Sequence, residues 1–145
     1  MRALVLLAAI SLALTACVKP GVGGSVGGLV GAIDVSDGLA GDLGHLLERS
    51  RVAATVEWDR VPRSNALQGT DARVQQRCVF AGGDDYELLF TASPSAADAV
   101  LAAGLAAGVA VTRIGTIRAG SGLTVVDADG RAMDTAPRAF DHFRP

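Results

Sequence analysis

Residues 33–39 read IDVSDGL, and this stretch places two carboxylates and a glycine where an apolar segment gives way to a helical pattern. A second acidic stretch, GGDDYEL at residues 82–88, follows about fifty residues later. An unpaired buried carboxylate is very costly, so these side chains require water, a basic partner or a hard cation. Mg²⁺ prefers oxygen ligands of this kind. The spacing alone therefore predicts a Mg²⁺–phosphate site, and it leaves the substrate open.

The first acidic stretch has a structural explanation as well as a functional one. Residues 30–35 form a short apolar run that we interpret as a buried strand or the entry to a helix. Ser36 or Asp37 is expected to cap a helix whose leucines at 39, 43, 46 and 47 share one face. A capping role would explain Asp37 without any ligand. Asp34 lies inside the apolar run, where no cap explains it, so we favour a ligand role for Asp34.

The start of this helix also predicts an anion site, because its first amide groups lack partners within the helix. A phosphate held by these amides and a metal held by Asp34 and Asp37 could coexist. Further along the helix, we expect Asp42 to be a solvated residue and His45 to lie at the edge of the core or in an interface.

The second acidic stretch also combines glycine with carboxylates. Its two glycines allow positive φ and a close approach of the backbone to a phosphate or a metal. The alternative is a hairpin turn with solvated Asp84 and Asp85. Residues 86–91 predict a strand, and Glu87 is a carboxylate in this otherwise apolar segment. Because the strand has no structural need for that charge, Glu87 is a candidate binding residue.

The rest of the chain predicts an α/β fold. Strands are expected at residues 53–58, 109–117 and 122–126, and a helix at residues 93–108. Residues 63–76 are expected to be a loop with a helical piece. The segment DADG at residues 127–130 lacks the full calcium-loop pattern, so we expect a hairpin turn there.

Composition narrows the possible functions. Half of the 145 residues are hydrophobic, which is enough for the core of one compact domain. The net charge of −2 argues against a surface that binds nucleic acid, since such a surface usually shows as a basic patch. Cys17 and Cys78 form no metal-type cluster, and nothing in their spacing favours a disulfide.

The N-terminal residues differ in character from the rest. Arg2, an apolar run over residues 3–14 and a small-residue end indicate a secretory signal, and LTAC at residues 14–17 fits a lipoprotein box that would lipidate Cys17. The alternatives are an Ala/Leu-rich helix of the fold and a misplaced start. Residues 21–31 are rich in Gly and Val and predict a flexible linker. We therefore divide the chain into a signal-like segment with its linker, residues 1–31, and a domain, residues 32–145.

The ordered motifs IDVSDGLAGDLGHLL, AGGDDYELLF, TRIGTI and FDHF resemble the C-terminal domain of bacterial thiamine-monophosphate kinase, within the aminoimidazole-ribonucleotide-synthetase-like superfamily. The resemblance covers residues 32–143. It implies an α/β fold with a mixed sheet and packed helices. It also implies phosphorylation of thiamine monophosphate to thiamine diphosphate, with Mg²⁺ as cofactor and ATP as co-substrate. The family's N-terminal ATP-binding half is missing, so we expect an inactive fragment.

The resemblance also implies roles for individual residues. Asp34 and Asp37 would bind Mg²⁺, Ser36 an ATP phosphate, and Glu87 and Phe140 the thiamine moiety; Asp84, Asp85 and Phe143 are further candidates. No side chain is needed as a nucleophile, because the acceptor phosphate already is one. Full-length family members are expected to be cytoplasmic homodimers. A lipid-anchored envelope protein, attached through Cys17, and another ATP-dependent synthase of the superfamily are the alternatives.

Overall fold

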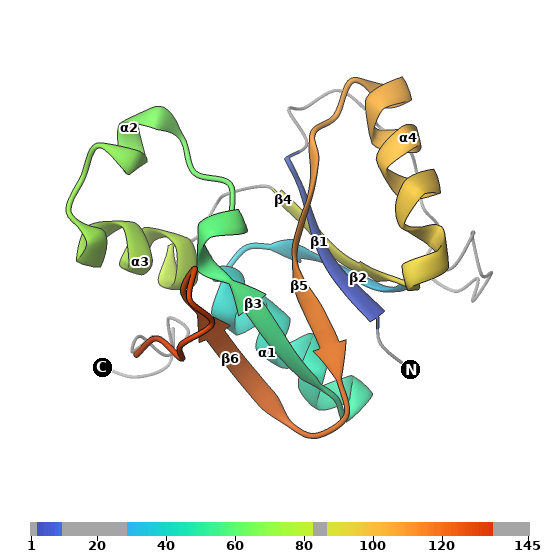
Figure 1. The fold of residues 1–145 in the computed structure, drawn as a ribbon, viewed down its shortest axis with the longest axis horizontal. Coiled ribbons are helices and arrows are strands. Elements are labelled where there is room, and N and C mark those ends of the chain that lie inside the picture. Colours follow the sequence, from blue (N-terminus) through green and yellow to red (C-terminus); the bar gives the residue numbers. More distant parts are fainter. Residues whose placement is uncertain (1–2, 10–28, 83–86, 135–145) are drawn as a thin grey trace.

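The structure, a computed structural model, describes residues 3–9, 29–82 and 87–134. Strands and helices alternate along these residues in the manner expected of an α/β fold (Figure 1). The strands are β1 (Ala3–Ala9), β2 (Leu29–Val35), β3 (Ala53–Glu57), β4 (Glu87–Ala92), β5 (Val111–Arg118) and β6 (Gly122–Val126). The helices are α1 (Leu39–Ser50), α2 (Asn65–Gln68), α3 (Ala72–Ala81) and α4 (Ala97–Ala107), with 3-10 turns η1 (Trp58–Arg60) and η2 (Pro94–Ala96).

The strands form one sheet in the order β2-β4-β1-β5-β3-β6. Neighbouring strands are antiparallel except β3 and β6, which are parallel. This confirms the predicted mixed sheet with packed helices. Strand β1 comes from the segment that the sequence marks as signal-like, and its backbone pairs with β4 on one side and β5 on the other.

Two hydrophobic clusters lie on opposite faces of the sheet, because successive residues of a strand point to opposite sides. Leu89 of β4 belongs to the larger cluster, which packs against α1, and Phe90 belongs to the smaller one, which packs against α4. Helix α1 buries Leu39, Leu43 and Leu47, spaced four residues apart on one face. The predicted apolar face of this helix is confirmed for these three leucines, whereas Leu46 is only partly buried.

The segment between β3 and β4 is more helical than expected. Residues 63–76 were expected to be mainly loop, but α2 and α3 occupy much of this segment, and α3 continues to Ala81. Asp71 begins α3 by accepting a hydrogen bond from the amide of Arg73. Near the other end of α3, Phe80 is fully buried and lies 5.4 Å from Trp58, measured between ring centroids. Trp58 therefore packs against the core.

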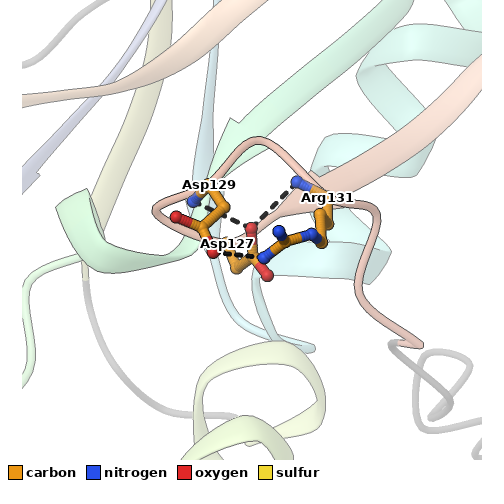
Figure 2. Close-up of polar contacts among 3 residues, drawn as sticks. All are labelled: Asp127, Asp129 and Arg131. Carbon is orange, nitrogen blue, oxygen red and sulfur yellow. Dashed lines mark hydrogen bonds and ion pairs between the residues drawn. The ribbon is translucent and has the colours of Figure 1, made fainter.

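The turn after β6 contains Asp127, Asp129 and Arg131 (Figure 2). The Asp127 carboxylate accepts hydrogen bonds from the amides of Asp129, at 3.0 Å, and Arg131, at 2.8 Å. The Arg131 side chain also pairs with that of Asp129. The predicted hairpin turn is confirmed, and the Asp127 carboxylate has a structural role in it.

Among the described residues, every helix is too short or too polar to cross a membrane. Cys78 is a free and exposed thiol, whereas Cys17 lies outside the described residues.

Candidate functional site

The end of the first acidic stretch's strand lies beside Glu87 and Leu88, the described end of the second acidic stretch. Strands β2 and β4 are antiparallel, with Asp34 opposite Leu88 and Val35 opposite Glu87. The last residue of β2 is therefore the direct neighbour of the first residue of β4. The turn at residues 36–38 follows β2 at this point, and the second acidic stretch leads into β4.

A buried carboxylate holds the first acidic turn in place. Asp42 is 3% exposed, and its Oδ2 atom accepts hydrogen bonds from the amide of Ser36, at 2.9 Å, and from the amide of Asp37, at 3.0 Å. The expectation that Asp42 is solvated is wrong. The physical reason is that the first turn of a helix carries unpaired amide groups, and a carboxylate there can satisfy those of the preceding turn as well.

The helix cap also differs from the expectation. The N-cap residue is Gly38, with φ 94° and ψ 151°, so neither Ser36 nor Asp37 occupies the N-cap position of α1. A Cβ atom at Gly38 would lie 2.5 Å from the backbone oxygen of Phe80. Glycine is therefore required twice, by the positive φ and by the close approach of the end of α3. This contact fixes α3 against the acidic turn.

The predicted metal and phosphate ligands are spread around this turn. Asp34 and Ser36 are exposed, and Asp37 is partly buried. Asp34 shares the sheet face of its partner Leu88, whereas Glu87 shares the opposite face with Val35. The sheet thus separates Asp34 from Glu87, which favours two distinct subsites rather than one four-residue cluster.

The donor set suits Mg²⁺. No group of three or more potential metal-ligating side chains occurs within residues 3–9, 29–82 and 87–134. Asp34, near the end of β2, and Asp37, in the turn that follows, carry oxygen ligands of the kind that this ion takes, since it usually keeps several waters and binds one or two carboxylates together with substrate phosphates. The amides of Ser36 and Asp37 already donate to Asp42. A phosphate at this turn would therefore depend on the Ser36 hydroxyl and on a metal, rather than on those two amides.

A cavity of about 220 Å³ opens beside the turn. Its walls combine apolar side chains with one carboxylate and one guanidinium: Val35, Leu39, Val61, Pro62, Arg63, Ser64, Leu67, Cys78, Val79 and Glu87. The Arg63 guanidinium carbon lies 4.4 Å from the centre of the Trp58 ring, and Nη1 of Arg63 donates to Oε1 of Gln75 at 3.1 Å. The cavity therefore presents one positive and one negative side chain within a largely apolar wall.

Sequence reasoning missed Asp42, Arg63 and Cys78 as residues of this region. The signal for Asp42 was its place in the first turn of a predicted helix. Arg63 and Cys78 carried no local signal, because they reach the cavity only through the packing of α2 and α3. His45 is exposed on α1, so it does not lie at the edge of the core, and the interface alternative stays a prediction. Asp84, Asp85, Phe140 and Phe143 lie outside the described residues, and their roles stay predictions.

Comparisons with protein families, with curated proteins and with solved structures all find relatives of one kind. Residues 14–128 match the family described as AIR synthase related protein, C-terminal domain. The thiamine-monophosphate kinase of Haemophilus influenzae is 38% identical over 117 residues, which cover 78% of this chain and 36% of the relative. The chain therefore spans about a third of the length of the curated relatives it matches.

Solved structures show the same likeness. The crystal structure of thiamine-monophosphate kinase from Stenotrophomonas maltophilia is 43% identical, with a TM-score of 0.65, and the match covers 73% of this chain and 33% of that one. A structure of AaThiL complexed with AMPPCP and TMP is 29% identical, with a TM-score of 0.59, over 80% of this chain and 34% of that one.

Proposed function

The chain belongs to the family of AIR synthase related proteins through their C-terminal domain, and we propose that it supplies the substrate-facing part of a thiamine-monophosphate kinase. The observation that carries this proposal is the cavity of about 220 Å³ beside the acidic turn, with Glu87 in its wall. Thiamine carries a cationic thiazolium ring and an aminopyrimidine. A carboxylate recognises both through charge-assisted hydrogen bonds and Coulomb attraction.

We assign the residues of the turn to the phosphate side of the reaction. Asp34 and Asp37 would hold Mg²⁺, and the Ser36 hydroxyl would contact an ATP phosphate. Bound Mg²⁺ would neutralise charge on the phosphates during transfer. Phosphoryl transfer depends mainly on positioning and charge stabilisation, so no nucleophilic side chain is required. Phe140 would contact the thiamine moiety together with Glu87, and Asp84, Asp85 and Phe143 would add to the site.

The assembly and location follow from the same proposal. The match covers about a third of the relatives' length, so the ATP-binding part would come from elsewhere, and we propose a homodimer for the full-length enzyme. We place this chemistry in the cytoplasm, where ATP is available. The chain alone is expected to show negligible turnover. Clear kinase activity from it would contradict the proposal that ATP binding depends on another part of the enzyme.

The first test is the binding of thiamine monophosphate to the chain, measured by isothermal titration calorimetry with Mg²⁺ and a non-hydrolysable ATP analogue present. Glu87→Gln is expected to weaken binding about tenfold or more, because a charged hydrogen bond contributes about 1.5–3 kcal/mol. Glu48→Gln, at an exposed position of α1, is the matched control and is expected to leave the affinity unchanged.

Two outcomes would refute the proposed substrate. One is equal affinity of the Glu87→Gln variant and the parent chain. The other is stronger binding of a phosphorylated ribonucleotide without a thiamine ring, which would favour another ATP-dependent synthase of the superfamily.

A further inference from the structure

We propose that Asp42 is the positioning residue of the acidic turn. By accepting from the amides of the turn, its carboxylate prevents an anion from binding there and leaves the turn to cations. Its Oδ2 atom occupies the place to which the amides of Ser36 and Asp37 point, which is where a phosphate oxygen would otherwise bind. The inference rests on the metal role proposed above for Asp34 and Asp37, and it is independent of the thiamine substrate.

Two backbone amides of the acidic turn converge on the Asp42 carboxylate. Two successive amides, of Ser36 and Asp37, lie 2.9 and 3.0 Å from the same oxygen atom. Successive amides that converge in this way form an anion-binding concavity, and the N-terminus of a helix strengthens it. Asp42 fills this concavity with an anion from within the chain.

The Asp42 carboxylate is also buried. Asp42 is 3% exposed, so water competes little with the two amides for its carboxylate. Gly38 closes the turn on the other side, with its backbone against the end of α3. The conformation of residues 36–38 is therefore fixed from two directions, by the Asp42 carboxylate and by the packing of α3.

The chemical consequence is that the acidic turn favours a cation over a phosphate. While the Asp42 carboxylate is in place, these two amides have no capacity left for a phosphate. The turn then offers oxygen atoms, from the Asp34 and Asp37 carboxylates, to a divalent cation. A phosphate would be held here by way of that cation and the Ser36 hydroxyl.

A Mn²⁺ titration of the whole chain, followed by the electron paramagnetic resonance signal of free Mn²⁺, tests the positioning role. Asp42→Ala is expected to lower the Mn²⁺ affinity about tenfold, the lower end for loss of a residue that orients metal ligands. Asp42→Asn keeps a carbonyl oxygen that can accept from both amides, and its affinity is expected to stay within about threefold of the parent chain. Asp98→Ala removes an exposed carboxylate from the first turn of α4 and is the matched control, with no change expected.

The results distinguish a positioning role of Asp42 from a role through its charge alone and from a role in stability alone. If Asp42→Asn loses as much Mn²⁺ affinity as Asp42→Ala, then Asp42 acts through its charge and the positioning role is refuted. If Asp42→Ala is less stable but binds Mn²⁺ like the parent chain, then Asp42 only supports the fold, and the proposal is equally overturned.

Formate provides a second test that needs no metal. It carries the carboxylate that Asp42→Ala removes, so it is expected to raise the thermal unfolding midpoint of that variant by several degrees and to leave the parent chain unchanged at the same ionic strength. Equal effects of formate and chloride on the variant would refute an anion-filled concavity. If the parent chain fails to bind Mn²⁺, the metal role of Asp34 and Asp37 fails, and the formate test still decides the role of Asp42.

Discussion

Replacement of Gly38 by alanine tests how the acidic turn is held against α3. The backbone at Gly38 has φ 94° and ψ 151°, a region that is open almost only to glycine and costs other residues about 1–3 kcal/mol. The new Cβ atom would also lie 2.5 Å from the Phe80 oxygen and 2.8 Å from Cα of Ala81. Relief of such an overlap costs about 1–3 kcal/mol more. We therefore expect Gly38→Ala to lower the free energy of unfolding by about 2–6 kcal/mol.

Urea denaturation is the assay, followed by far-UV circular dichroism and by the fluorescence of Trp58. The indole ring lies 5.4 Å from Phe80, so its emission reports on the end of α3 that the new methyl group would displace. For a domain whose total stability is about 5–15 kcal/mol, the expected loss moves the midpoint by a large fraction of its value.

Gly44→Ala is the matched control for this substitution. Gly44 lies in the interior of the same helix, and nothing is within 4 Å of the position its Cβ would take. Alanine in a helix interior is favoured over glycine by about 0.5–1 kcal/mol, so this variant is expected to be more stable than the parent chain. The reasoning is refuted if Gly38→Ala is within about 0.5 kcal/mol of the parent chain, the usual range for surface changes, or if both variants shift in the same direction.

Three further predictions use other parts of the fold. Leu43→Ala, at a fully buried position, is expected to cost about 2–5 kcal/mol in urea denaturation, whereas Leu105→Ala, at a position 83% exposed, is expected to stay within about 0.5 kcal/mol. Arg63→Ala is expected to change the fluorescence of Trp58 and to cost about 0.5–1 kcal/mol through the lost cation–π contact, while Arg63→Lys should retain part of that contact. Deletion of residues 1–9 is expected to abolish cooperative unfolding in circular dichroism, because it removes the strand between β4 and β5; an unchanged transition would show that this strand is dispensable.

The elements that the sequence predicted well are those with a strong local signal. The leucines of α1 repeat at helical spacing, and β3, β4, β5 and β6 each appear within a few residues of their expected bounds. The turn at Asp127 was predictable from its residue types alone. These features depend on periodicity and turn chemistry, which are properties of a short window of sequence.

The features that were missed depend on residues distant in the sequence. Gly38 is required because the end of α3, some forty residues later, lies against it, and no pattern around residue 38 shows that neighbour. Arg63 and Cys78 reach the cavity through the packing of α2 and α3. The hydrogen-bond partners of Asp42 are closer in the sequence, only five and six residues away. Its polar side chain and helical position favoured solvent exposure, and only the fold shows that the amides of the turn converge on it.

The exposure of Asp34 changes the basis of the argument for its role. In the sequence, an aspartate within an apolar run pointed to a ligand, because a buried charge needs a partner. In the structure, β2 is an edge strand and the Asp34 side chain is exposed, so water satisfies its charge without a metal. The metal role therefore no longer follows from the cost of burial. The proposed metal role now depends on the arrangement around the acidic turn, in which the buried carboxylate of Asp42 accepts from the amides and the side chains of Asp34 and Asp37 would be the oxygen ligands of a cation.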